Sequence, residues 1–145
     1  MIEVNYPEPL FKIRQEEGRP YLFDEMRKVW LLLTEEEWVR QNFVQYLIKE
    51  LQYPSALIAL EKELMLHGLK KRFDVLVYDQ NHEPWMLIEC KAPNITLDDS
   101  VLEQLLRYNI SIPVSFLVIT NGSQTYGWKK TGSGVEQLRQ LPQLQ

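Results

Sequence analysis

The sequence RFDVLVYDQNHEPWMLIECK, residues 72–91, has two apolar segments separated by a polar turn. Residues 72–78 and 85–91 are rich in β-branched and aromatic side chains, which favour strands. Residues 79–84 contain the Asp, Asn and Pro that are typical of turns. We therefore predict that the two segments pair as a hairpin, and that a third strand at 60–66 precedes them in a meander.

The segments around this meander predict two helices and two more strands. Residues 34–37, TEEE, fit a capping box that begins a helix of roughly 18 residues, ending near Gln52. Thr96 is expected to cap a second helix that runs to about Asn109. The other predicted strands are at 115–120 and 126–128. The predicted fold is α/β, or α+β, with a mixed sheet of about four to five strands flanked by helices.

The start of the chain is predicted to form a hairpin extension that packs on the core. Residues 11–13 and 21–23 alternate apolar and polar side chains on either side of a turn at 16–19. A short extended segment follows at 29–33, and the glycine-containing tail from Thr131 is expected to be mobile. The predicted organisation is a single domain with an N-terminal extension at 1–33, a core at 34–130 and a tail at 131–145.

The composition limits the class of protein. The chain has 145 residues, enough for one domain, with 45% hydrophobic and 25% charged residues and no apolar run that spans a bilayer. The first residues lack the pattern of a secretory signal, so a cytoplasmic location is expected. One cysteine, Cys90, with His67 and His82, excludes an internal disulfide and a tetrahedral structural zinc site. The net charge of −4 disfavours a protein that coats nucleic acid.

Three charged side chains lie at the open end of the predicted hairpin. Asp74 is in a mostly apolar strand, and Glu89 and Lys91, two residues apart, point to the same face of the sheet. Asp74 and Glu89 should face each other, and a hard cation such as Mg²⁺ would relieve the repulsion between two close carboxylates. The Cys90 carbonyl is a further candidate ligand, and Lys91 would orient or help deprotonate an attacking water. The alternative is a surface ion pair at a strand end.

The predicted first helix places two charged residues on its apolar face, Glu36 and Arg40. Because the capping box accounts for Glu37, Glu36 is the better candidate for an additional metal or water ligand. The alternative is a buried Glu36–Arg40 ion pair without a chemical role.

The predicted second helix places Gln104 within an inward stripe of Leu97, Val101, Leu105 and Tyr108. Gln104 and Tyr108 would present an amide and a phenol side by side, to a phosphate or to the site carboxylates. The alternative is an amide bonded to backbone groups of the core.

Basic residues precede Asp74 directly in the sequence. Lys70, Lys71 and Arg72 form either a phosphate-facing patch or a solvated run at a strand entry. With Arg40, they are the candidate nucleic-acid contacts.

The motifs above resemble those of one nuclease family in type and order. The matching segments are TEEEWVRQ at 34–41, KRFD at 71–74, IECKAP at 88–93, QLLRYN at 104–109 and TNG at 120–122. The chain resembles the N-terminal nuclease domain of the type I restriction enzyme R subunit, in the PD-(D/E)XK superfamily. That resemblance implies a restriction-endonuclease-like core and a Mg²⁺-dependent DNA endonuclease, with Mn²⁺ able to replace Mg²⁺.

The resemblance also implies roles for individual residues. Asp74, Glu89 and Lys91 match the signature triad, Gln104 and Tyr108 match the Gln-x-x-x-Tyr element of RecB-type nucleases, and Glu36 matches the acidic residue of the first helix. Phe73 stands where the superfamily has proline. The chain has no Gly-x-x-x-x-Gly-Lys-Ser/Thr loop, so ATP-driven translocation is not expected.

The expected function is therefore hydrolysis of DNA phosphodiester bonds. The expected partners are DNA, separately encoded restriction or repair subunits, and a second copy in a homodimer. Two alternatives remain: a nucleic-acid-binding or adaptor module that kept the fold without turnover, and a purely structural domain with ion-paired strand ends.

Overall fold

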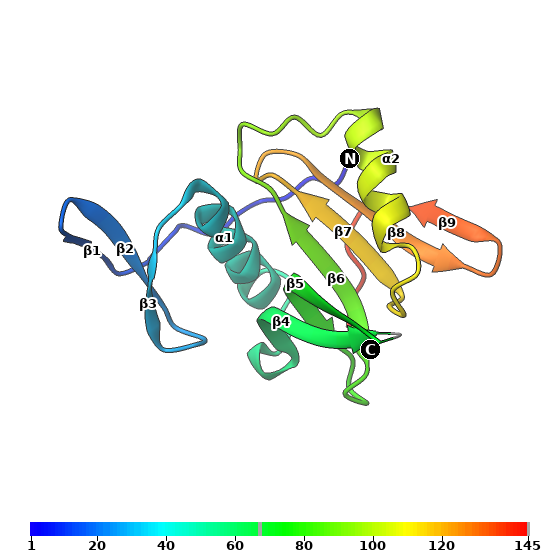
Figure 1. The fold of residues 1–145 in the computed structure, drawn as a ribbon, viewed down its shortest axis with the longest axis horizontal. Coiled ribbons are helices and arrows are strands. Elements are labelled where there is room, and N and C mark those ends of the chain that lie inside the picture. The colour runs from blue at the N-terminus through cyan, green and yellow to red at the C-terminus, as the bar shows by residue number, and fades with distance from the viewer. Residues whose placement is uncertain (67, 145) are drawn as a thin grey trace.

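The chain folds as a mixed six-stranded sheet with a helix on each face and a separate three-stranded sheet (Figure 1). The computed structural model describes residues 1–66 and 68–144. The predicted mixed sheet with flanking helices is confirmed, with six strands in place of four to five. The elements in chain order are β1 (Ile13–Glu16), β2 (Arg19–Asp24), β3 (Val29–Leu32), α1 (Glu35–Lys49), a 3₁₀ turn (Ser55–Leu57), β4 (Ile58–Leu66), β5 (Leu69–Tyr78), β6 (Pro84–Cys90), α2 (Asp99–Asn109), β7 (Phe116–Thr120), β8 (Thr125–Thr131) and β9 (Gly134–Gln137).

The large sheet has the order β4-β5-β6-β7-β8-β9. The first three strands form the predicted antiparallel meander. α2 carries the chain from β6 to β7, which pairs parallel to β6, as a helical crossover allows. β8 and β9 then add antiparallel strands at the far edge.

The helices cover opposite faces of the large sheet, because alternate strand residues point to opposite faces. Val75 and Ile88 belong to the core cluster that contains Phe43 of α1. Leu76 and Leu87 belong to the cluster that contains α2 residues. Among the described residues no helix is long and apolar enough to cross a membrane.

The residue that caps the first helix is the predicted one, and the residue that caps the second helix is not. Thr34 caps α1 as predicted, since its hydroxyl accepts a hydrogen bond of 3.0 Å from the Glu37 N–H. The helix ends at Lys49, earlier than predicted, because Gln52 adopts a left-handed φ of 59°. α2 is capped by Asp98, whose carboxylate accepts from the Val101 N–H at 2.9 Å. The prediction of Thr96 as this cap is wrong.

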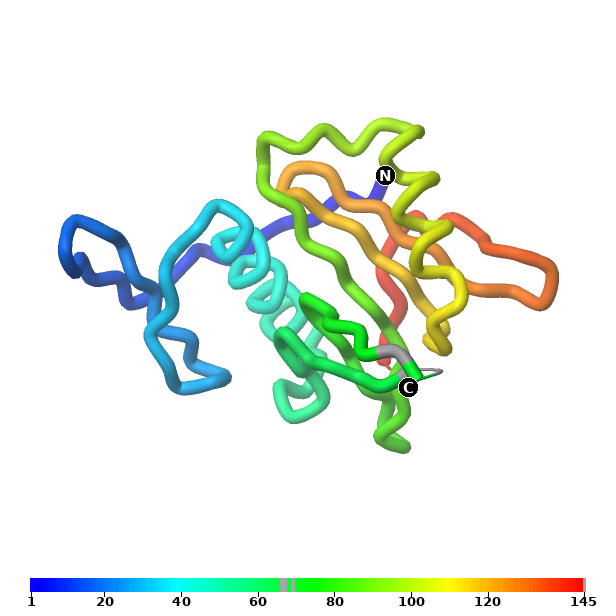
Figure 2. The backbone as a smooth tube through the Cα atoms, in the orientation of Figure 1, coloured from blue at the N-terminus to red at the C-terminus, as the bar shows by residue number. Residues whose placement is uncertain are grey.

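The N-terminal extension contains the predicted hairpin. β1 and β2 pair across a turn in which Glu17 and Gly18 have positive φ values of 50° and 77°, as a tight two-residue hairpin turn requires. The extended segment at 29–33 pairs with β2 as a third strand. The tube in Figure 2 shows this sheet on the other side of α1 from the large sheet.

Both ends of the chain pack on the large sheet, which the sequence pattern did not predict. Ile2 is 3% exposed, and its N–H donates to the Thr125 carbonyl at 2.8 Å. At the other end the predicted mobile tail is wrong in part, since β9 pairs with β8 and Leu141 is 5% exposed. The Tyr53 hydroxyl donates to the Pro142 carbonyl and holds this tail.

Leu141→Ala is expected to destabilise the fold by about 2–3 kcal/mol, because it removes a buried side chain and leaves a cavity. Chemical denaturation measures this change. Leu10→Ala is the matched control, since Leu10 is 75% exposed and should change the free energy of unfolding by less than about 0.5 kcal/mol. Equal effects of the two substitutions would contradict a docked tail.

Candidate functional site

Asp74 of β5 and Glu89 of β6 lie next to the last residues that pair these two strands, close to the C-terminal end of β6. The antiparallel register pairs Val75 with Ile88, so the next residues on the two strands are Asp74 and Glu89. Asp74 Oδ2 accepts a 2.8 Å hydrogen bond from the Cys90 N–H across the strands. Lys91 Nζ lies 3.1 Å from Glu89 Oε1. The structure therefore brings the three residues of the predicted triad together.

Each of the two carboxylates is held by one helix. From α1, Arg40 Nη1 lies 3.3 Å from Asp74 Oδ1. From α2, the Asn109 amide donates to Glu89 Oε2 at 3.1 Å and to the Leu105 carbonyl at 2.9 Å. Asn109 is buried, and the sequence did not single it out because it stands at the last position of the helix. The signal that could have identified Asn109 is its position as a polar residue next to the apolar face of the predicted helix.

Arg40 is itself fixed by a buried ion-pair network. It is 6% exposed, and its Nε and Nη2 donate to the Glu37 carboxylate at 3.1 and 2.8 Å. Arg27, from the turn after β2, bonds Glu61 of β4 at 2.8 Å and lies 3.7 Å from Glu37. Asp24 of β2 binds Arg27 in turn. The network connects the three-stranded sheet to the position of Asp74.

The alternative of a buried Glu36–Arg40 pair is wrong, because Glu37 is the partner of Arg40. Only the backbone N–H of Glu37 serves the Thr34 cap, which leaves the Glu37 carboxylate for Arg40 and Gln41. Glu36 is exposed. Desolvation raises the pKa of Glu36, and the Asp74 carboxylate raises it further, so Glu36 lies at the edge of the site. The contact predicted between Arg40 and nucleic acid has no support in this buried placement.

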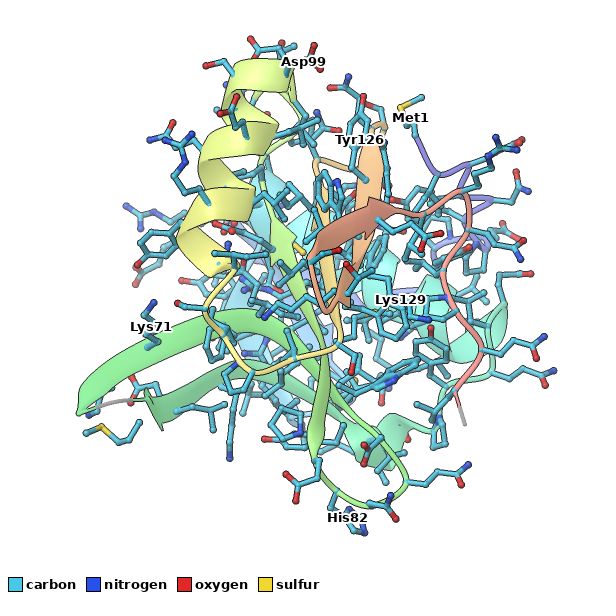
Figure 3. The ribbon with its side chains drawn as sticks, turned by 90° about the vertical axis from the view of Figure 1, so that its right-hand side faces the viewer. Met1, Lys71, His82, Asp99, Tyr126 and Lys129 are labelled. Carbon is cyan, nitrogen blue, oxygen red and sulfur yellow. The ribbon has the colours of Figure 1, made fainter. Side chains whose placement is uncertain are left out.

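A pocket of about 230 Å³ adjoins the carboxylate pair. Figure 3 shows one of its basic residues, Lys71, beside the C-terminal end of α2. Lys71 Nζ lies 4.8 Å from the centre of the Tyr108 ring, a cation–π distance. The lining residues are Lys70, Lys71, Arg72, Phe73, Asp74, Leu87, Ile88, Glu89, Tyr108 and Asn109. The pocket thus has acidic and apolar walls and a basic rim.

A larger cavity of about 740 Å³ lies elsewhere, between the start of β7 and the C-terminal tail. Glu136 is its one carboxylate among the lining residues, so it has no acidic pair. The smaller pocket is the candidate site because it adjoins the clustered charges.

Burial raises the pKa of Asp74 above its ordinary value of 3.8. The Cys90 N–H and Arg40 act in the opposite direction, and the negative charge of Glu89 adds to the increase. Two carboxylates at short range in a half-buried position are the arrangement that a divalent cation or a proton stabilises.

A comparison with known protein families gives a match over most of the chain. The family model of the type I restriction enzyme R protein N terminus matches residues 35–142. The chain belongs to this family. The match extends from the first residue of α1 through the buried tail and omits β1–β3. No curated protein matches the chain.

Two other residues of the predicted site are placed differently from expectation. Gln104 is exposed and Tyr108 is 67% exposed, so their predicted inward placement is wrong, whereas Leu97, Val101 and Leu105 of the predicted stripe do pack in the core. The residues of α2 that face the core are Val101, Leu102, Leu105, Leu106 and Asn109. Tyr108 lines the pocket from its rim, whereas Gln104 has no place among the lining residues.

The basic run at residues 70–72 lies along the pocket rim. Lys70 and Arg72 are exposed and pair with Glu63 at 3.5 Å and with Glu61 at 3.1 Å. Their positions leave the cationic groups open to solvent and near Asp74. Contact of this run with nucleic acid stays a prediction.

The donor set is suited to Mg²⁺. Asp74 and Glu89 offer carboxylate oxygens, and Mg²⁺ is commonly held by one or two carboxylates and several waters. Among residues 1–66 and 68–144, no group of three or more His, Cys, Asp or Glu side chains is placed to hold a metal. Glu36 is therefore not part of a preformed cluster, and a ligand role for the Cys90 carbonyl stays a prediction. His67 lies outside the described residues.

Asp74→Asn is expected to raise the Tm at pH 7 in buffer that contains EDTA. Because the pKa of Asp74 is raised on folding, the folded state binds this proton more tightly than the unfolded state, and stability falls as the pH rises above 3.8. The substitution replaces the ionisable carboxyl by a neutral amide, so this pH-dependent loss of stability no longer occurs. Thermal unfolding should show the gain in Tm shrinking as the pH is lowered toward 3.8. A gain that does not vary with pH would contradict this assignment.

Proposed function

We propose that this domain hydrolyses phosphodiester bonds of DNA in a Mg²⁺-dependent reaction. The observation that carries the proposal is the cluster of Asp74, Glu89 and Lys91 beside a pocket with a basic rim. Membership in the restriction R protein family supports a nuclease-like role. Asp74 and Glu89 are the proposed metal-holding residues.

Different residues of the chain have different roles in the proposed reaction. Lys70, Lys71 and Arg72 on the rim would bind phosphate groups of the substrate. The Lys91 ammonium, 3.1 Å from Glu89, would orient the attacking water and offset negative charge that develops on the phosphoryl oxygens. Mg²⁺ held by Asp74 and Glu89 would supply Lewis-acid stabilisation when bound.

Arg40 and Asn109 would act as positioning residues. In the structure each oxygen of the two carboxylates has an N–H partner, which fixes both groups in place. Metal binding must therefore replace some of these contacts. The partner of lowest burial is Lys91, whose side chain is 33% exposed and free to move toward the substrate.

A second candidate is a binding module that retains the fold without turnover. The contacts of the carboxylates favour it, because each oxygen of Asp74 and Glu89 already has an N–H partner and none is left free for a metal. A homodimer, separately encoded partner subunits and a cytoplasmic location belong to either proposal.

Incubation of supercoiled plasmid with the purified chain tests the choice. A nuclease should convert the plasmid to nicked circles with Mg²⁺ or Mn²⁺ and should stop when EDTA is added. A binding module should shift the plasmid equally well with metal and with EDTA and leave it intact. Absence of nicking at any Mg²⁺ or Mn²⁺ concentration would reject hydrolysis of this substrate.

A further inference from the structure

The three-stranded sheet has one covered face and one open face. Leu22 and Asp24 of β2 are 0% and 1% exposed, and Asp24 accepts a hydrogen bond of 3.3 Å from Gln41 of α1. Their side chains therefore point toward the helix. Since neighbouring residues of a strand point to opposite faces, Tyr21 and Phe23 point away from α1, toward solvent.

The open face interleaves aromatic rings with cations. Register pairs Phe23 with Trp30 across the strands, and the two ring centres are 5.3 Å apart. The guanidinium of Arg14 lies 4.1 Å from the centre of the Trp30 ring. Lys12 Nζ lies 5.8 Å from the centre of the Phe23 ring. The aromatic surface is thus continuous across β2 and β3 and carries a cation over each of these two rings.

The charge of this face differs from that of the whole chain. Lys12, Arg14 and Arg19 share it with Glu16, which pairs with Arg14 at 3.5 Å, and with Glu17 of the adjoining turn, which lines a pocket with Glu16 and Tyr21. The three cations exceed the two carboxylates, whereas the chain as a whole has a net charge of −4. The face is therefore a slightly positive surface on an acidic chain, and its cations are the groups that an anionic ligand would contact.

We propose that this face, formed by Lys12, Arg14, Arg19, Tyr21, Phe23 and Trp30, binds single-stranded nucleic acid. Cations pair with the phosphates, and unstacked bases stack on aromatic rings. A duplex conceals the faces of its bases, so the rings favour a single strand. An acidic protein would use the cations but would gain no stacking from the rings.

Ion pairs connect the three-stranded sheet to the candidate site. Arg27, in the turn between β2 and β3, bonds Glu61 at 2.8 Å, and Glu61 pairs with Arg72 on the pocket rim at 3.1 Å. The three strands lie outside the residues that match the family, 35–142. The face is therefore an addition to the shared core, on the side of the three-stranded sheet that points away from α1. The choice of nucleic acid as ligand rests on the proposed function.

Fluorescence anisotropy with a labelled oligothymidylate and with a duplex of the same length tests the proposal, using the full chain in EDTA. The single strand should bind at least about five-fold more tightly than the duplex. Trp30→Leu should weaken single-strand binding at least about five-fold, because one stacking ring is lost. Arg14→Gln should reduce the slope of log affinity against log salt by about 0.7, whereas Trp30→Leu should leave the slope unchanged.

Two controls separate this surface from general charge and from unfolding. Arg139→Gln removes an exposed arginine of the tail and should alter neither affinity nor slope. Trp30→Phe keeps a ring against Phe23 and should retain binding. Equal affinity for duplex and single strand, or equal effects of Arg14→Gln and Arg139→Gln, would overturn the proposal. The binding assay contains EDTA, so it tests this face independently of the metal-dependent reaction. If the single strand binds as expected but the plasmid is not nicked in the separate assay, only the proposed hydrolysis is rejected.

Discussion

Lys91→Ala is expected to lower the rate of Mg²⁺-dependent plasmid nicking at least about 100-fold. A donor aimed at charge that develops in a transition state typically contributes a factor of about 10² to 10³. Lys91 lies 3.1 Å from Glu89 and follows directly after β6. The strand therefore holds the backbone of Lys91 in place, while its side chain remains 33% exposed. The substitution removes the ammonium and leaves the fold around it.

The stability and the DNA affinity of this variant should change little. A pair with both side chains partly exposed contributes less than about 1 kcal/mol, so the Tm should remain within a few degrees of the parent value. Lys49→Ala, at the exposed end of α1, is the matched control and should nick at the parent rate. Nicking by Lys91→Ala at the parent rate would remove Lys91 from the proposed mechanism.

Arg40→Met is expected to destabilise the fold by about 3 kcal/mol, a decrease in Tm of about 10 °C. Arg40 and Glu37 are 6% and 5% exposed, and Arg40 also lies near Asp74 and Glu61 at 3.3 and 3.5 Å. Methionine fills part of the same volume but leaves the buried Glu37 carboxylate without this cation. The main source of the loss is that this buried charge keeps only a more distant cation, Arg27, at 3.7 Å.

A double substitution distinguishes charge from packing in this network. Glu37→Gln combined with Arg40→Met should recover part of the lost stability, because the uncompensated carboxylate is removed. Arg139→Met, at an exposed position, should change the free energy of unfolding by less than about 0.5 kcal/mol. If the double variant is as unstable as Arg40→Met, loss of packing and not the buried charge explains the effect.

The sequence was most informative where the pattern is local. The β-branched and aromatic content of the two segments and the turn at 79–84 predicted the β5–β6 hairpin, and that register alone brings Asp74 opposite Glu89. The placement of Lys91 beside Glu89 follows from the period of two in a strand. These contacts need no information from distant parts of the chain.

The inward face of α2 was centred too far toward Tyr108. Leu97, Val101 and Leu105 of the predicted stripe do pack in the core, but Tyr108 does not. At about 100° per residue, the buried Leu102 and Asn109 lie on the opposite side of Leu105 from Tyr108, so the true inward face is rotated toward them. The exposed Gln104 and the buried Asn109 are therefore exchanged relative to the prediction.

The ion-pair network could not be predicted from sequence patterns. Glu36 and Glu37 are separated by 100° around the helix, and the capping pattern alone does not determine which one meets Arg40. Arg27 and Glu61 reach the same network from segments far apart in the chain. Their proximity depends on how the two sheets pack on α1, which no local motif reports.

The packing of Ile2 against the large sheet means that the unit of folding is larger than the unit of sequence similarity. A chain shortened to residues 35–142 would keep every matched residue, but it would expose the core beneath Ile2 and remove Arg27 from the network. Shortened versions of this domain should therefore begin at Met1 whatever the similarity boundary suggests. Met1 itself is 65% exposed, so an affinity tag placed before it meets no packed surface.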